Sequence, residues 1–226
     1  MDIVLIGGLW LTASAWDAVA SELTRLGHDP IPVDLPGQGD GKQATLDDQV
    51  DAVIAAVDDA PRPCLVVGHS AACTLAWLAA DALPEKVVKV VLIGGFPSAG
   101  GTPYADFFPI VDGTMPFPGW EPFAGPDSAD LTPGQKDAFA AAAVPVPEGV
   151  AKAEVHYADE RRFEVPVVLI CPEFAPEDAQ AWLDAGEIPE LAQAEDVTLV
   201  DLDSGHWPML TRPVDLADLL ADAARP

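Results

Sequence analysis

One serine lies where a hydroxyl group could act as a nucleophile. Ser70 stands in the stretch 68–72, between an apolar run at 64–67 and an alanine-rich apolar run at 71–83. The first run is typical of a buried strand and the second of a helix. A serine in the sharp turn between a strand and a helix is raised above both, where its hydroxyl can meet a base.

A histidine near the C-terminus could supply that base. His206 lies in the loop 203–208, after an apolar run at 197–202 and before an amphipathic stretch at 213–224. Histidine has a pKa near neutrality, so it can take a proton from a serine hydroxyl and return it. Because the loops that follow parallel strands gather at one edge of a sheet, we expect His206 to lie close to Ser70.

Composition excludes several classes of protein. The chain has 226 residues, enough for a single domain, and half of them are hydrophobic, so extensive disorder is not expected. The sequence carries 37 acidic and 11 basic residues, for a net charge of −26. Such a surface repels nucleic acid and anionic membranes, and we exclude both as partners. No apolar stretch approaches the roughly 20 residues that span a bilayer.

The cysteines and the N-terminus bear on compartment and cofactors. Cys64, Cys73 and Cys171 have the spacing of neither a disulfide framework nor a metal site, and we expect them to be buried free thiols. No basic segment precedes the first apolar run, which argues against a signal peptide. We therefore predict a cytoplasmic protein without metal or cofactor that acts on a small molecule as a monomer or homodimer.

Apolar and amphipathic stretches alternate along the chain. We expect strands at 2–6, 30–35, 64–67, 87–94, 165–171 and 197–202, and helices at 14–26, 45–57, 71–83, 176–185 and 213–224. The strands are continuous Val, Ile and Leu runs, which is typical of strands buried on both faces. The pattern predicts an α/β fold with a mostly parallel sheet and helices on both of its faces.

The interval 97–164 interrupts this alternation between two late strands. It is rich in Pro, Gly and aromatic residues, and it holds a helix expected at 133–143 with Thr132 as its N-cap. A structureless loop of this length is uncommon within a compact domain. We therefore predict that residues 97–164 form a short cap or lid inserted into a single domain spanning 1–226.

The chain resembles the α/β-hydrolases from Asp2 to Leu220, and among them it is most similar to the small plant-type methylesterases and hydroxynitrile lyases. The resemblance implies that Ser70 is the nucleophile, that His206 is the base, and that the backbone N–H groups of Leu9 and Ala71 form an oxyanion hole. Gly7 stands where a histidine is more common. Four stretches carry the resemblance: Ile6–Trp10, Trp16–His28, Gly68–Ala72 and Ser204–Met209.

The acid that would orient His206 is less clear. The family usually has an aspartate just after the strand expected at 165–171, but Phe174 or Ala175 falls at that place. Glu173 is the nearest carboxylate, and its longer side chain could reach His206 from the adjacent position. Asp106, in the loop after the preceding strand, is the alternative, and a site without an acid also stays open.

Three functions from different classes follow. The first is a serine hydrolase that cleaves a small apolar or neutral carboxylic ester. The second is C–C bond cleavage on the same fold, although Trp207 stands where the related lyases have a lysine. The third is a non-catalytic ligand-binding protein with an incomplete triad. For a substrate pocket we expect five aromatic residues: Trp10, Phe107, Phe108, Trp120 and Trp207.

Overall fold

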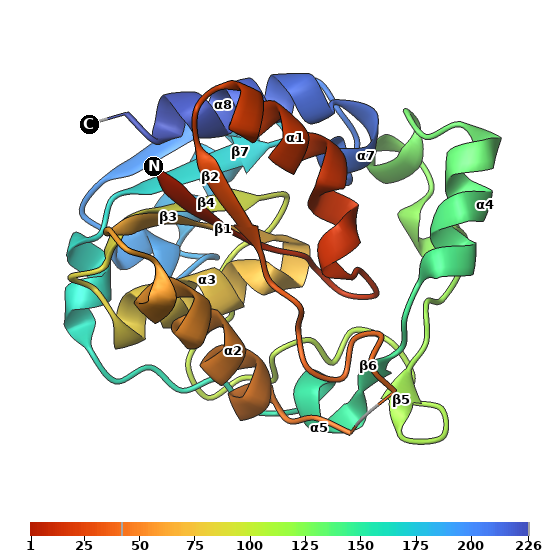
Figure 1. Ribbon diagram of the computed structural model, residues 1–226. Coiled ribbons are helices and arrows are strands. Elements are labelled where there is room, and N and C mark those ends of the chain that lie inside the picture. Colours follow the sequence, from red (N-terminus) through yellow and green to blue (C-terminus); the bar gives the residue numbers. More distant parts are fainter. Residues whose placement is uncertain (42, 226) are drawn as a thin grey trace.

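A single parallel sheet forms the centre of the computed structural model, which describes residues 1–41 and 43–225. Its six strands lie in the order β2-β1-β3-β4-β7-β8, and every neighbouring pair is parallel (Figure 1). The strands are β1 Asp2–Ile6, β2 Asp29–Pro32, β3 Cys64–His69, β4 Val87–Ile93, β7 Val167–Cys171 and β8 Val197–Asp201.

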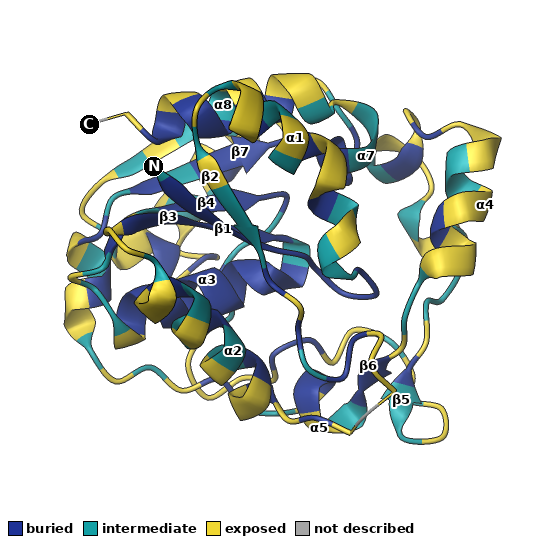
Figure 2. Ribbon diagram, viewed as in Figure 1, coloured by how far each residue is buried: buried dark blue, intermediate teal, exposed yellow. Residues whose placement is uncertain are grey.

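Helices cover both faces of the sheet. In Figure 1, α1 and α8 lie above it, and α2 and α3 lie below it. Successive strand residues point to opposite faces, so Val4, Val66 and Val90 pack toward α2 and α3, whereas Ile3 and Leu65 pack toward α1 and α8. Figure 2 shows the result, with the buried central strands β1 and β3 between helices whose outer surfaces are exposed. The helices are α1 Asp17–Arg25, α2 Leu46–Asp59, α3 Cys73–Ala82, α6 Pro176–Ala185, α7 Pro208–Thr211 and α8 Pro213–Ala223.

Strand β2 is shorter than the run 30–35 suggested, and it lies at an edge of the sheet. The Asp29 amide donates to the carbonyl oxygen of Met1, just before β1, and the Val33 amide donates to that of Leu5 in β1. Pro30 and Pro32 alternate with these residues, so they fall on the outward side of the strand, where no amide is needed. The proline positions therefore follow from the edge position of β2.

Residues 97–164 leave the sheet after β4 and return to it at β7. They form a two-stranded antiparallel sheet, in which β5 Thr114–Met115 pairs with β6 Val146–Pro147, and the helices α4 Pro133–Ala142 and α5 Glu148–Ala151. Thr132 is the N-cap of α4, as the sequence suggested, and its hydroxyl and the Gln135 side chain cap the first turn reciprocally. Figure 1 shows α4 beside the sheet and β5, β6 and α5 beneath it. Among the described residues, no helix is long and apolar enough to cross a bilayer.

A buried ion network holds the chain where it returns to β7. Arg162 lies 3.2 Å from Asp81 of α3 and 3.1 Å from Glu190, and the three side chains are at most 10% exposed. The Trp77 indole also donates to Glu190, and the backbone amides of Ala158 and Asp159 donate to Asp81. Since the two carboxylates share one guanidinium, removal of Arg162 would leave two buried charges unpaired.

We predict that Arg162→Met lowers the free energy of unfolding by about 3–5 kcal/mol, because it strands those carboxylates. The measurement is urea unfolding followed by circular dichroism. The matched control is Arg161→Met: the neighbouring arginine forms ion pairs that are largely exposed, so little change is expected. Equal effects of the two substitutions would contradict the prediction.

Candidate functional site

Ser70 lies in a strained turn between β3 and α3. Its φ is 56°, a left-handed conformation that costs a residue with a side chain about 1–3 kcal/mol. Two glycines make this turn possible. A Cβ on Gly68 would collide with the carbonyl oxygen of Ala72, and one on Gly95 would lie 2.6 Å from the Ser70 carbonyl oxygen. The hydroxyl therefore projects from the carboxyl edge of the sheet.

His206 reaches Ser70 from the loop that follows β8. Its Nε2 lies 2.9 Å from the Ser70 Oγ, although 136 residues separate the two in sequence. Strands β3 and β8 are parallel, so the loops after them open at the same edge. The expected meeting of hydroxyl and imidazole is therefore present in the structure.

Glu173 is the carboxylate that contacts His206. It follows β7 by two residues, and its Oε1 lies 2.6 Å from the His206 Nδ1, with both side chains about one-seventh exposed. Gly94 leaves the space for this contact, because a Cβ there would lie 3.3 Å from that nitrogen. Asp106, the alternative, is exposed, and its charge acts instead on Lys152. Phe174 turns away and packs against Phe96 and Trp182.

Leu9 and Ala71, the residues expected to form an oxyanion hole, both lie next to the cavities at Ser70. Ala71 is the second residue of the 3₁₀ helix η2 (Ser70–Ala72). The first amides of a helix have no carbonyl partner within the helix, so the Ala71 N–H is free to bind another acceptor. Leu9 follows Gly8, where a Cβ would lie 2.9 Å from the His69 carbonyl oxygen. Because Gly8 has no side chain, the loop that follows β1 can approach the turn at Ser70. Leu9 and Ala71 each line a cavity that Ser70 also lines.

Two cavities meet at Ser70. The smaller one, of about 50 Å³, lies between Ser70, His206 and an aromatic wall. The larger one, of about 370 Å³, opens on the other side of Ser70. Phe107, whose surface is 63% exposed, lines both cavities. A molecule bound at Ser70 would therefore meet one confined side and one open side.

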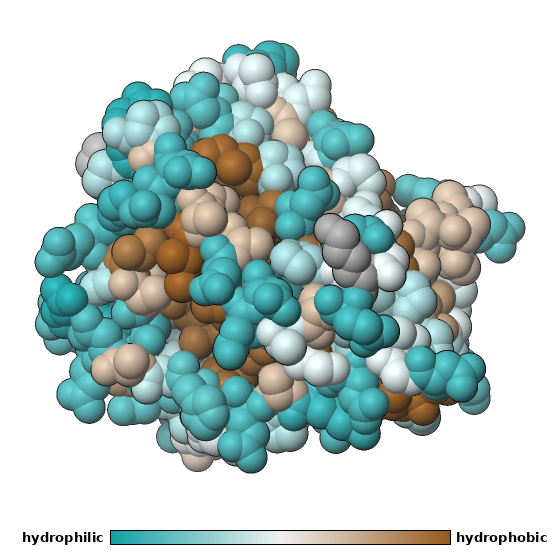
Figure 3. All heavy atoms as spheres, turned by 60° about the horizontal axis from the view of Figure 1, so that its bottom comes forward, coloured by the Kyte–Doolittle hydropathy of each residue, from teal (hydrophilic) through white to brown (hydrophobic). Residues whose placement is uncertain are grey.

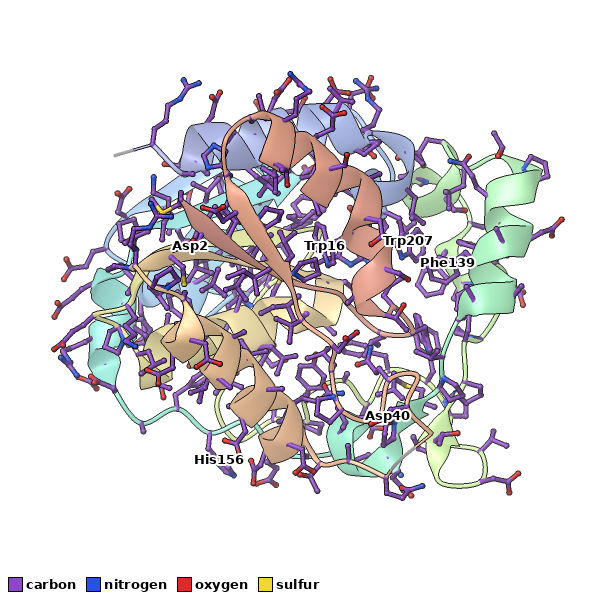
Figure 4. The ribbon with its side chains drawn as sticks, in the orientation of Figure 1. Asp2, Trp16, Asp40, Phe139, His156 and Trp207 are labelled. Carbon is purple, nitrogen blue, oxygen red and sulfur yellow. The ribbon has the colours of Figure 1, made fainter. Side chains whose placement is uncertain are left out.

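Four of the five aromatic residues expected around a pocket line the smaller cavity, namely Trp10, Phe107, Phe108 and Trp207. Trp120 does not line either cavity at Ser70. Its ring packs behind Trp207, with centroids 5.2 Å apart, and its indole donates to the Lys136 carbonyl. Figure 4 shows Trp207 and Phe139 facing each other in the same aromatic layer.

Several cavity residues were not anticipated. Phe123 completes the wall of the smaller cavity, where Trp120 was expected. Phe123 is one of several aromatic residues in 97–164, but the sequence does not indicate which of their rings point toward Ser70. On the larger cavity, α6, which packs against β8, contributes Trp182. Other side chains of that cavity that the sequence did not indicate are Phe96, Ser98, Tyr104 and Phe174.

His69, next to Ser70, is buried beneath the His206 loop. It is 1% exposed, and its Nε2–H donates to the His206 carbonyl oxygen at 2.7 Å. Its Nδ1 has no hydrogen-bond partner among the described residues. Burial, together with the neighbouring His206, lowers the pKa of His69 to about 3. The ring is therefore neutral near pH 7 and holds its proton on Nε2.

The described residues contain no group of three or more His, Cys, Asp or Glu side chains that could hold a metal ion. All three cysteines are buried free thiols. Burial raises the pKa of Cys64 to about 11 and that of Cys171 to about 12, so these thiols are not ionised near neutral pH.

The fold and this arrangement of side chains match a known family. A profile of the Alpha/beta hydrolase family matches residues 3–219, and the chain belongs to that family. This confirms the fold class and the resemblance seen in the sequence. A search of curated proteins found no match to the chain.

Solved structures share the fold at low sequence identity. An extracellular alpha/beta-hydrolase from a Paenibacillus species, described as homologous to tobacco salicylic acid binding protein 2, superposes with a TM-score of 0.82 at 20% identity over 100% of both chains. A pyrethroid hydrolase from Sphingobium faniae gives 0.71 at 21%, over 98% of this chain and 96% of that one. The Arabidopsis methylesterase MES16 gives 0.73 at 15%, over 99% and 98%.

The buried His69 predicts a specific dependence of stability on pH. Its pKa is lowered from an ordinary value of about 6.5, so between pH 6.5 and about 3 the unfolded chain binds a proton that the folded chain does not. This histidine therefore lowers the free energy of unfolding as the pH falls, by about 1.4 kcal/mol per pH unit. The loss of stability that His69 causes is largest at low pH and vanishes above pH 6.5.

We expect His69→Gln to remove this dependence, because the glutamine amide can donate to the same carbonyl but does not titrate near neutral pH. Urea unfolding of both proteins at pH 6.0, 5.0 and 4.5 measures the difference. The stability of the native protein should fall relative to the variant by the stated slope. Parallel pH profiles for the two proteins would contradict the buried neutral state of His69.

Proposed function

We propose that this protein is a serine hydrolase that cleaves small apolar or neutral carboxylic esters. One observation carries the proposal: Ser70, His206 and Glu173 form a continuous chain of hydrogen bonds at the carboxyl edge of the sheet. A hydroxyl paired with an imidazole, which is in turn paired with a carboxylate, is the arrangement that activates serine for attack on a carbonyl carbon.

Each group has a role in that reaction. The Ser70 Oγ attacks the ester carbonyl while the His206 Nε2 takes its proton, and Glu173 stabilises the imidazolium through Nδ1–H. The amides of Leu9 and Ala71 donate to the oxyanion that forms. When the intermediate collapses, the proton on Nε2 goes to the leaving alkoxide, and an ester bond joins Ser70 to the acyl group. Water, deprotonated by His206, then releases the acid and restores Ser70.

The surroundings of Ser70 favour an apolar, uncharged substrate. Aromatic side chains form most of the wall of the smaller cavity, and the chain has a net charge of −26. On the face drawn in Figure 3, hydrophilic side chains cover most of the outer surface and apolar residues show in the hollows between them. An anionic substrate would be repelled by this field, whereas a neutral ester would not. The printed names of the similar structures include a methylesterase and a pyrethroid hydrolase, which fits this class.

We also propose that residues 97–164 act as a cap within a single domain. Three side chains of this segment, Phe107, Phe108 and Phe123, line the smaller cavity above Ser70. They limit access of water and exclude bulky groups from that side. Buried free thiols fit a reducing compartment, and we infer a cytoplasmic protein on that ground.

Replacement of Ser70 by alanine tests the nucleophile. We expect Ser70→Ala to lower the hydrolysis of p-nitrophenyl acetate and butyrate by about 10⁴-fold or more, and to abolish labelling by a fluorophosphonate. Labelling reports an activated serine even where the natural substrate is absent from the panel. Equal rates for the native protein and the variant, together with no labelling of either, would favour a non-catalytic ligand-binding protein.

Replacement of Glu173 by glutamine tests the acid. The amide keeps the size of the side chain but cannot stabilise the His206 imidazolium, so we expect kcat to fall by more than about tenfold. Asp106→Asn makes the same chemical change at the exposed alternative and should leave kcat unchanged. An unchanged rate for Glu173→Gln with a reduced rate for Asp106→Asn would reverse the assignment.

A further inference from the structure

The segment 97–164 does more than lie over Ser70, because it also holds the loop that carries His206. The His206 amide donates to the carbonyl oxygen of Asp127 at 2.8 Å. The Gly205 amide donates to the Asp130 Oδ2 at 2.9 Å, and the Ser204 hydroxyl donates to the same oxygen at 3.2 Å. Three consecutive residues of the histidine loop are thus bonded to one short stretch of the inserted segment.

The two stretches fit too closely to move independently. A Cβ on Gly205 would collide with the Asp130 Oδ1 and would lie 2.5 Å from the Asp127 carbonyl oxygen. Gly205 does not have a left-handed φ, so its lack of a side chain serves this close approach and not a turn. The position of the His206 backbone therefore depends on where residues 127–130 lie.

The same stretch is anchored to the wall of the smaller cavity. Ser128 is buried, its hydroxyl donates to the Phe123 carbonyl oxygen at 2.7 Å, and Lys136 of α4 donates to that hydroxyl at 2.9 Å. Phe123 lines the smaller cavity and packs against Trp207, with ring centroids 5.3 Å apart. One rigid turn thus places a cavity wall and holds the histidine loop.

We propose that Asp130 is a positioning residue for His206, through which the inserted segment sets the distance between the imidazole and the Ser70 hydroxyl. The proposal rests on the proposed function. His69 holds the carbonyl of His206 from the sheet side, and Asp130 holds the preceding amide from the cap side. Together these bonds hold the backbone of the histidine loop on both sides of the His206 side chain. Displacement of reacting groups by about 1 Å costs on the order of 100-fold in rate.

Asp130 contacts no cavity at Ser70, so its loss should change kcat and not the binding of substrate. We expect Asp130→Ala to lower kcat for p-nitrophenyl butyrate at least about tenfold with KM changed less than about twofold. Asp130→Asn retains an oxygen that can accept from the Gly205 amide, and it should recover most of the lost kcat. Asp137→Ala removes an exposed carboxylate of the same charge from α4 and should leave both constants unchanged.

The outcomes separate this proposal from the proposed function. If Ser70→Ala is as active as the native protein, the hydrolase assignment fails. If Ser70→Ala is inactive while Asp130→Ala keeps native kcat, only the positioning role of Asp130 is overturned. The role is also overturned if Asp130→Ala raises KM alone, or if Asp130→Asn loses as much kcat as Asp130→Ala. Circular dichroism of each variant verifies its fold. If the alanine variant does not fold, Asp130→Ser, whose side chain is too short to reach the Gly205 amide, takes its place with the same expected loss of kcat.

Discussion

Ser70 holds a left-handed backbone conformation, and the rest of the site depends on it. Neither Gly68, whose Cβ would meet the Ala72 carbonyl, nor Gly95, whose Cβ would meet the Ser70 carbonyl, has room for a side chain. The strain is maintained because β3 is a central strand that is buried along its whole length and pairs in regular register with β4 from Leu65 to His69. The packed sheet thus offsets the energetic cost of the strained backbone at Ser70.

The other groups reach Ser70 because of strand order. Strands β3, β4, β7 and β8 are consecutive neighbours in the sheet, and their loops contribute Ser70, Gly94, Glu173 and His206 in that spatial order. His206 is then held at three points: its Nδ1 by Glu173, its backbone carbonyl oxygen by His69, and its backbone amide by the Asp127 carbonyl oxygen of the inserted segment.

Much of this could be predicted from the sequence, because the signals were local. The strand, turn and helix around Ser70 and the loop at His206 are each contained in a few consecutive residues, and parallel strands then require their loops to meet. Glu173 could be named but not separated from Asp106, since the choice depends on the course of the chain after β7 and on the space beside Gly94. Trp120 was placed wrongly in the pocket and Phe123 was overlooked, because spacing in an irregular segment gives no ring direction.

The prolines of β2 have a consequence for assembly. Pro30 and Pro32 remove the outward amides from one edge of the sheet, so a second copy of the chain cannot add a strand there with a regular ladder. Any dimer built by joining two sheets into one would have to use the opposite border, at β8, whose carboxyl end leads into the His206 loop. Such self-association would bring the neighbouring copy close to the mouth of each reaction centre.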